Sequence, residues 1–109
     1  MTKDYRIYVK DILEAIASIE KFVQNMDFVI FVNDDKTTSA VIRKFEIIGE
    51  AAKQIPDNIK AKHITIPWKA MAGMRDKLIH FYAGVDHNLV WETIQTKLPE
   101  LKKALQQLP

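Results

Sequence analysis

The chain has 109 residues, which suits one domain, and its 48% hydrophobic and 28% charged residues are an ordinary globular balance. The lack of cysteine excludes a disulfide scaffold, thiolate metal sites and cysteine nucleophiles, and three glycines are too few for a phosphate-binding loop motif. The net charge of +2 does not by itself indicate binding to nucleic acid. No apolar run reaches the ~20 residues of a membrane span, and the first residues do not have the pattern of a signal peptide. We therefore expect one cytoplasmic domain over residues 1–109, without a membrane partner.

Apolar residues spaced three and four apart predict an amphipathic helix over roughly residues 4–24. The apolar patch at residues 27–32 is either a helical turn or a connector, and residues 33–37 form a polar break. A second amphipathic helix should follow and end before Pro56, because proline disfavours helix at the preceding residue.

The second half of the chain also has helical spacing. Residues 59–66 are predicted to form a loop, and Pro67 suits the first turn of a third helix that should run to about Tyr82. Asp86 is a candidate N-cap for a fourth helix, in which Pro99 predicts a kink or a restart. Because no alternating strand pattern is visible, the sequence predicts an all-α fold, an antiparallel bundle of four to five helices.

Positive charge is concentrated in residues 53–77, which carry six basic and two acidic side chains, whereas residues 1–52 sum to −2 and residues 78–109 to zero. A concave surface lined by such a cluster attracts phosphates, although on charge alone a solvated lysine-rich face is the better explanation of the composition. The candidate phosphate-binding lysines are Lys62, Lys69 and Lys77.

The predicted third helix places Gly73, Asp76 and His80 on a polar stripe opposite its core face. Arg75 and His80 lie about 140° apart on an ideal helix. They meet at one phosphate only if the arginine reaches round, the helix end unwinds, or a second subunit contributes its own copy. A mid-helix glycine costs about 1 kcal/mol relative to alanine, so we expect either a partner subunit or the monomer's own packing to come close at Gly73.

Each polar residue also has a structural explanation. A histidine near a helix C-terminus interacts favourably with the helix dipole, and Arg75 and Asp76 could form a solvent-exposed ion pair. Glu46 and Glu50 lie one turn apart on the second helix; an acid/base pair is conceivable there, but a solvated ion-pair stripe is the better prediction. The remaining histidines lack metal-ligand spacing, so no metal site is expected.

The run Arg75-Asp-Lys-Leu-Ile-His80-Phe-Tyr82 matches the pattern R-x4-H-x-Y, and five further blocks accompany it. These blocks are residues 40–52, 66–68, 72–75, 90–93 and 98–101. Together they resemble the HepT-like branch of the HEPN superfamily. The resemblance implies a HEPN-like helical bundle that forms a homodimer through the motif helix, sometimes with higher assembly. It also implies the toxin of a type II toxin–antitoxin pair, acting as a metal-independent endoribonuclease on an RNA substrate.

The resemblance also assigns site residues. Arg75 and His80 fall on the catalytic arginine and histidine, and Asp76 falls on an assisting polar position. The implied partner is an antitoxin of the MNT type, a small nucleotidyltransferase associated with AMP transfer onto the motif tyrosine, here Tyr82. No cofactor or metal is implied. The candidate RNA-binding residues are Lys69, Lys77 and Lys62.

The implied chemistry suits these residue types. The ribose 2′-OH attacks the phosphate and leaves a 2′,3′-cyclic phosphate and a 5′-OH, with histidine moving protons and arginine stabilising the phosphorane. A dimer would bring two copies of His80 to one cleft, and each Arg75 could serve the neighbour's histidine. AMP on Tyr82 would block RNA by size and charge. The alternatives are a non-catalytic HEPN module that oligomerises and binds the transferase or a nucleotide, and a purely structural bundle.

Overall fold

The computed structural model describes residues 4–80 and 84–109, and the regular elements among them are helices apart from one pair of two-residue strands. In chain order the elements are α1 Tyr5–Phe22, α2 Phe28–Val32, α3 Asp35–Lys53, α4 Asp57–Lys62, α5 Trp68–Ala72, α6 Met74–Leu78, β1 Ile79–His80, β2 Gly84–Val85, α7 His87–Glu92, the π-helical turn η1 Thr93–Lys97, and α8 Leu98–Gln106. The predicted all-α class is confirmed; the first two expected helices are α1 and α3, and the third and fourth are each divided into shorter pieces.

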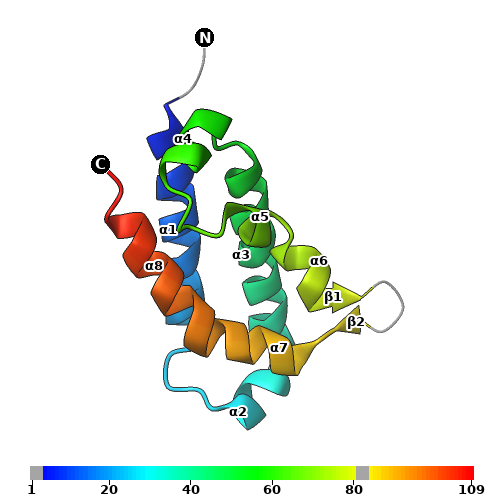
Figure 1. The fold of residues 1–109 in the computed structure, drawn as a ribbon. Coiled ribbons are helices and arrows are strands. Elements are labelled where there is room, and N and C mark those ends of the chain that lie inside the picture. Colours follow the sequence, from blue (N-terminus) through cyan, green and yellow to red (C-terminus); the bar gives the residue numbers. More distant parts are fainter. Residues whose placement is uncertain (1–3, 81–83) are drawn as a thin grey trace.

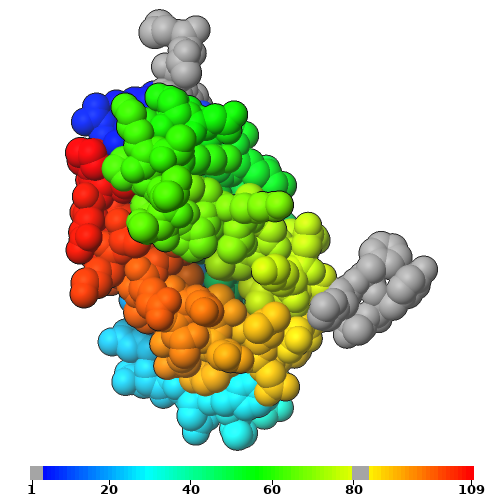
Figure 2. Space-filling model, in the orientation of Figure 1, coloured from blue at the N-terminus to red at the C-terminus, as the bar shows by residue number. Residues whose placement is uncertain are grey.

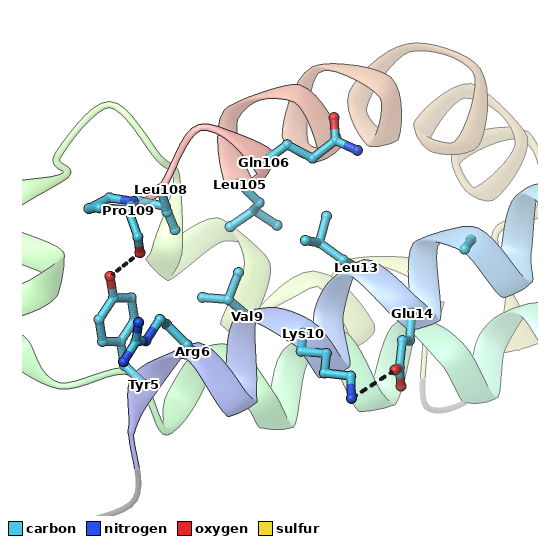
Figure 3. Close-up of a pocket in the computed structure, with 11 residues that line it drawn as sticks. Tyr5, Arg6, Val9, Lys10, Leu13, Glu14, Leu105, Gln106, Leu108 and Pro109 are labelled. Atoms are coloured by element: carbon cyan, nitrogen blue, oxygen red, sulfur yellow. Dashed lines mark hydrogen bonds and ion pairs between the residues drawn. The ribbon is translucent and has the colours of Figure 1, made fainter.

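The long helices are antiparallel neighbours. Figure 1 shows α1 descending and α3 ascending beside it, with α7, η1 and α8 forming a continuous C-terminal segment. The hydroxyl of Tyr5 donates a hydrogen bond to the carbonyl oxygen of Pro109 at 3.0 Å (Figure 3). The start of α1 therefore lies beside the end of α8, as an antiparallel bundle requires.

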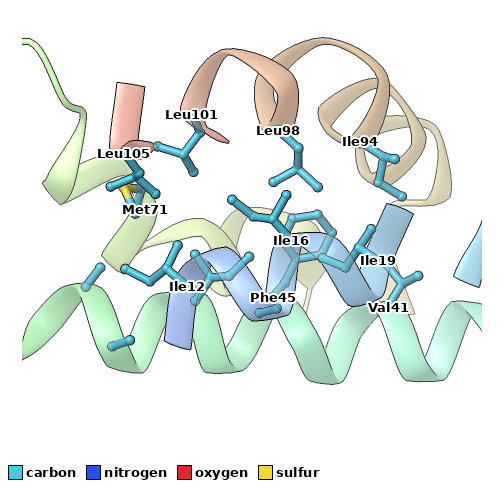
Figure 4. Close-up of a cluster of buried hydrophobic side chains, with 14 of the residues drawn as sticks. Ile12, Ile16, Ile19, Val41, Phe45, Met71, Ile94, Leu98, Leu101 and Leu105 are labelled. Carbon is cyan, nitrogen blue, oxygen red and sulfur yellow. The ribbon is translucent and has the colours of Figure 1, made fainter. Parts of the chain in front are cut away.

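The core lies between α1, α3, α5 and the C-terminal segment (Figure 4). The spacing that predicts the helices also selects the buried faces, because residues three and four apart share one side of a helix. Burying one large apolar side chain contributes about 1.5–3 kcal/mol, so this cluster dominates the stability of the fold. Its largest fully buried members include Ile12, Ile16, Ile19, Phe45, Ile48, Met71, Leu98 and Leu105.

Aspartates cap four of the described helices at their N-termini: Asp4 caps α1, Asp27 caps α2, Asp34 caps α3 and Asp86 caps α7. The Asp34 carboxylate accepts a hydrogen bond from the backbone N–H of Thr37 at 3.0 Å, which lowers the pKa of Asp34 because it stabilises the charged form. The Arg6 guanidinium, which donates to Asp4, lowers the pKa of Asp4 to about 2. The predicted N-cap Asp86 is confirmed, since its carboxylate accepts from the backbone N–H of Leu89 at 3.1 Å.

The restart predicted at Pro99 is also confirmed. Proline has no N–H to close the regular helical turn behind it, and its ring crowds the carbonyl of that turn. The chain widens into the π-helical turn η1 and resumes as α8, with Pro99 in the first turn.

Two predictions about the middle of the chain are wrong. The expected loop over residues 59–66 overlaps α4, which runs to Lys62. The expected third helix is interrupted at Gly73 and ends at Leu78, and the next two residues form a strand that the sequence pattern did not predict. Strand β1 pairs antiparallel with β2, so backbone hydrogen bonds to residues beyond the helix replace the helical ones.

Within residues 4–80 and 84–109, none of the helices combines the length and the apolar character needed to cross a bilayer.

Candidate functional site

Arg75 lies on the short helix α6, where its side chain is 50% exposed. The helix is anchored by Leu78, which is fully buried in the core. Two carboxylates flank the Arg75 guanidinium: Glu46 Oε2 of α3 lies 3.6 Å from Nε, and Asp76 Oδ1 lies 3.6 Å from Nη1. The guanidinium is thus presented at the surface, with a carboxylate from another helix on one side and its sequence neighbour on the other.

A close approach of α3 to the end of α5 explains how Glu46 reaches Arg75. Gly49, one turn after Glu46, is buried, and a Cβ built there would lie 3.3 Å from the carbonyl oxygen of Ala72 and 3.5 Å from that of Met71. Only glycine lets the two backbones pack this closely without a shift. Because α6 begins two residues after Ala72, the same approach brings Arg75 alongside Glu46.

Of the two explanations for Gly73, close packing within the monomer is not found among the described residues, whereas the approach of a partner subunit stays a prediction. A Cβ at Gly73 would meet only the carbonyl oxygen of Lys69, at an ordinary 3.6 Å. Gly73 instead joins α5 to α6, with φ −93° and ψ 4°, so it is not in mid-helix. The glycine that permits close packing is Gly49.

The backbone of His80 belongs to strand β1, where His80 pairs with Gly84 and Ile79 with Val85. The N–H of Asp86 donates to the carbonyl oxygen of Leu78 at 2.8 Å, directly beyond the strand pair. Gly84 has φ +78°, a left-handed conformation that glycine adopts without a steric penalty. These contacts end the helix before His80.

Consequently the 140° separation of an ideal helix does not apply to Arg75 and His80. Of the three conditions under which the two residues could meet at one phosphate, the chain meets the second, because the helix ends before His80. Both dimer formation and the interpretation that each Arg75 serves a neighbour's histidine stay predictions. Tyr82, the predicted AMP acceptor, lies outside the described residues.

The three predicted RNA-binding lysines are all exposed, on three successive short helices. Lys62 ends α4, Lys69 lies on α5 and Lys77 on α6. Lys77 also lines a hollow of about 540 Å³ between α5, α6 and the C-terminal segment, and Lys97 and Glu100 line the same hollow. Figure 2 shows this face, with α5 and α6 in yellow-green and the C-terminal segment in orange. Lys97 could not be predicted from the basic segment, because it lies outside that segment and joins it only through folding.

A second hollow, of about 560 Å³, lies between the first turns of α1 and the end of the chain (Figure 3). Its polar lining includes Lys10 and Glu14, which form an ion pair at 3.8 Å. None of the motif residues that the structure describes contributes to it. In the described part of the chain, no group of three or more histidine and carboxylate side chains is arranged to hold a metal ion.

The family described as "Ribonuclease HepT-like" matches residues 12–108 of this sequence. The chain belongs to the HepT-like family. A Thermococcus cleftensis protein named "Probable ribonuclease HepT" is 48% identical, over 99% of this chain and 98% of its own length. The Methanocaldococcus jannaschii protein "Putative RNase MJ1216" is 45% identical, over 97% of this chain and 88% of its own. The Caldanaerobacter subterraneus protein "Putative RNase TTE0752" is 43% identical, over 97% of this chain and 95% of its own length. No solved structure gives a significant match.

The family match confirms the resemblance drawn from R-x4-H-x-Y and its neighbouring blocks. The site that a HepT-like chain presents here has an exposed arginine, a histidine whose backbone is held by a strand pair, and exposed lysines nearby in sequence. The contact between Glu46 and Arg75 was not predicted from the sequence. Its signal was the glycine one turn later, which marked a close helix contact.

Proposed function

We propose that this chain is an endoribonuclease that cleaves RNA without a metal ion, through the 2′-OH of the ribose. Membership of a ribonuclease family with an intact R-x4-H-x-Y motif carries this proposal. The half-exposed guanidinium of Arg75 supports it, because that group is accessible to a phosphate and presents several donors to its oxygens.

Each motif residue has a distinct role in the proposed reaction. His80 moves the proton of the 2′-OH or of the leaving 5′-oxygen, since imidazole titrates near neutral pH. Arg75 stabilises the charge that develops on the phosphorane. Asp76, which is 84% exposed, assists from the neighbouring position. A homodimer supplies a second His80, so that one imidazole acts as base and the other as acid.

We further propose that the protein is the toxin of a type II toxin–antitoxin pair in the cytoplasm. Its partner is a nucleotidyltransferase antitoxin of the MNT type, which silences it by transferring AMP to Tyr82. The added phosphate places negative charge two residues from His80, where it repels the RNA backbone. Lys62, Lys69 and Lys77 guide that backbone by their charge.

The test compares wild type, His80→Ala and His63→Ala, each induced alone and at matched protein level. His63 is a matched control because it is the C-cap residue directly after α4, outside the motif, and it accepts the hydrogen bond from the indole N–H of Trp68 with its backbone carbonyl alone. We expect wild type and His63→Ala to arrest growth and to produce discrete RNA ends on a denaturing gel, and His80→Ala to do neither.

Assays of the purified protein measure RNA cleavage independently of growth arrest. Cleavage of RNA should persist in EDTA and leave 2′,3′-cyclic phosphate ends. Activity lost in EDTA and restored by a divalent ion would contradict the metal-independent mechanism. A folded wild type that neither cuts RNA nor arrests growth would favour the non-catalytic HEPN module instead.

A further inference from the structure

We infer that Glu46 is a positioning residue for Arg75, holding the guanidinium in the orientation that receives the scissile phosphate; the inference rests on the proposed ribonuclease function. The two side chains come from different parts of the chain and meet because α3 packs against the end of α5 at Gly49. Glu46 Oε2 approaches Arg75 Nε, the guanidinium nitrogen nearest the flexible methylene stem. A contact at Nε restrains the methylene stem of Arg75, while the terminal amino groups of the guanidinium extend beyond the contact.

The two carboxylates beside Arg75 are not equivalent. Asp76 is 84% exposed and belongs to the same short helix, so it is well screened by water and can turn away when a phosphate arrives. Glu46 is 35% exposed and is carried by the long helix α3, whose buried face fixes it in the core. Glu46 is therefore the fixed support, and Asp76 the movable neighbour.

The contact has little value for stability, which points to a role in orientation. The distance of 3.6 Å between Glu46 Oε2 and Arg75 Nε is too long for a hydrogen bond. An ion pair between half-exposed side chains contributes little to the free energy of folding. Transition-state stabilisation is far more sensitive to position, because a small misplacement of a catalytic group costs large factors in rate.

The sign of the charge makes the role testable. A carboxylate beside a phosphate-binding arginine opposes the binding of RNA, so replacing Glu46 with glutamine should not weaken that binding. If Glu46 orients Arg75, the same replacement should lower kcat on the order of tenfold while KM stays equal or falls. A general loss of structure would instead lower thermal stability and raise KM.

Glu50 provides a matched control. It lies one turn further along α3 and is 71% exposed, and its carboxylate pairs with Lys53 of the same helix at 3.3 Å. Glu50→Gln therefore removes the same charge from the same helix without touching Arg75. We expect it to leave kcat, KM and thermal unfolding at wild-type values.

The experiment measures steady-state cleavage of a labelled single-stranded RNA of mixed sequence by the full chain, with thermal unfolding of each variant recorded in parallel. The variants are Glu46→Gln, Glu50→Gln, Arg75→Lys and the double variant Glu46→Gln/Arg75→Lys. Because the flexible lysine cannot be oriented as a planar guanidinium is, Glu46→Gln should cause no further loss in the Arg75→Lys background.

Three results would overturn the inference: an unchanged kcat in Glu46→Gln, a raised kcat, which would make Glu46 a restraint, and an equal loss in both backgrounds. Wild type that cuts RNA beside an unaffected Glu46→Gln refutes the positioning role alone. A folded wild type that cuts no RNA refutes the proposed function, and the positioning role with it.

Discussion

Alanine at Gly49 and alanine at Gly73 should have opposite effects on stability. At Gly73 the backbone has φ −93° and ψ 4°, which alanine tolerates, and the new Cβ would lie 3.6 Å from its nearest described neighbour. Gly73→Ala should therefore raise the free energy of unfolding by about 0.4–1 kcal/mol, because it restricts the unfolded chain.

At Gly49 two terms oppose each other. Alanine is the better helix former by about 1 kcal/mol. Its Cβ, however, would lie 3.3 Å from the carbonyl oxygen of Ala72 and 3.5 Å from that of Met71, and backbone carbonyls cannot rotate away as a side chain does. Overpacking a filled contact costs about 1–3 kcal/mol. The net effect of Gly49→Ala is a loss of about 0–2 kcal/mol, so the two variants should differ by about 0.4–3 kcal/mol.

Urea unfolding followed by circular dichroism measures this difference directly. The RNA-cleavage assay should show a second effect: Gly49→Ala loses more activity than Gly73→Ala, because a shift of Ala72 displaces α6 and hence Arg75 from Glu46. If Gly49→Ala stabilises the chain as much as Gly73→Ala, the helix contact has room for a methyl group and the reasoning is refuted.

Three further predictions concern the core, a helix cap and RNA binding. Phe45→Ala should cost about 3–5 kcal/mol in urea unfolding, because the ring is fully buried; a loss below 1 kcal/mol would contradict that packing. The pKa of Asp34 is lower in the folded chain than its ordinary 3.8, so its contribution is complete above that pH and disappears as the pH falls through the folded-state value. The unfolding temperature of Asp34→Asn should therefore fall less at acidic pH than that of wild type. Parallel profiles of unfolding temperature against pH for the two proteins would contradict the stabilising role of the Asp34 cap. Replacing Lys69 and Lys77 by glutamine should weaken RNA binding and flatten its dependence on salt, whereas Lys10→Gln should change neither.

Much of the local structure could be predicted from the sequence because local interactions decide it. Apolar spacing predicts the long helices and their buried faces, and Asp86 and Pro99 act within one turn of their own positions. The ion-pair stripe expected on the second helix is realised at Glu50, which pairs with Lys53 three residues away. The motif itself is a linear pattern, so the family could be inferred before the fold was known.

The sequence by itself therefore determined the helical class, the family and the identity of the motif residues. Only the tertiary structure decided how those residues are presented. The helix before His80 ends because the carbonyl oxygen of Leu78 accepts a hydrogen bond from the N–H of Asp86, beyond the strand pair. Glu46 contacts Arg75 of α6, and not a neighbour on its own helix, because Gly49 lets α3 approach the end of α5. Both effects depend on contacts between different structural elements, and the spacing of neighbours along one helix carries no information about such contacts.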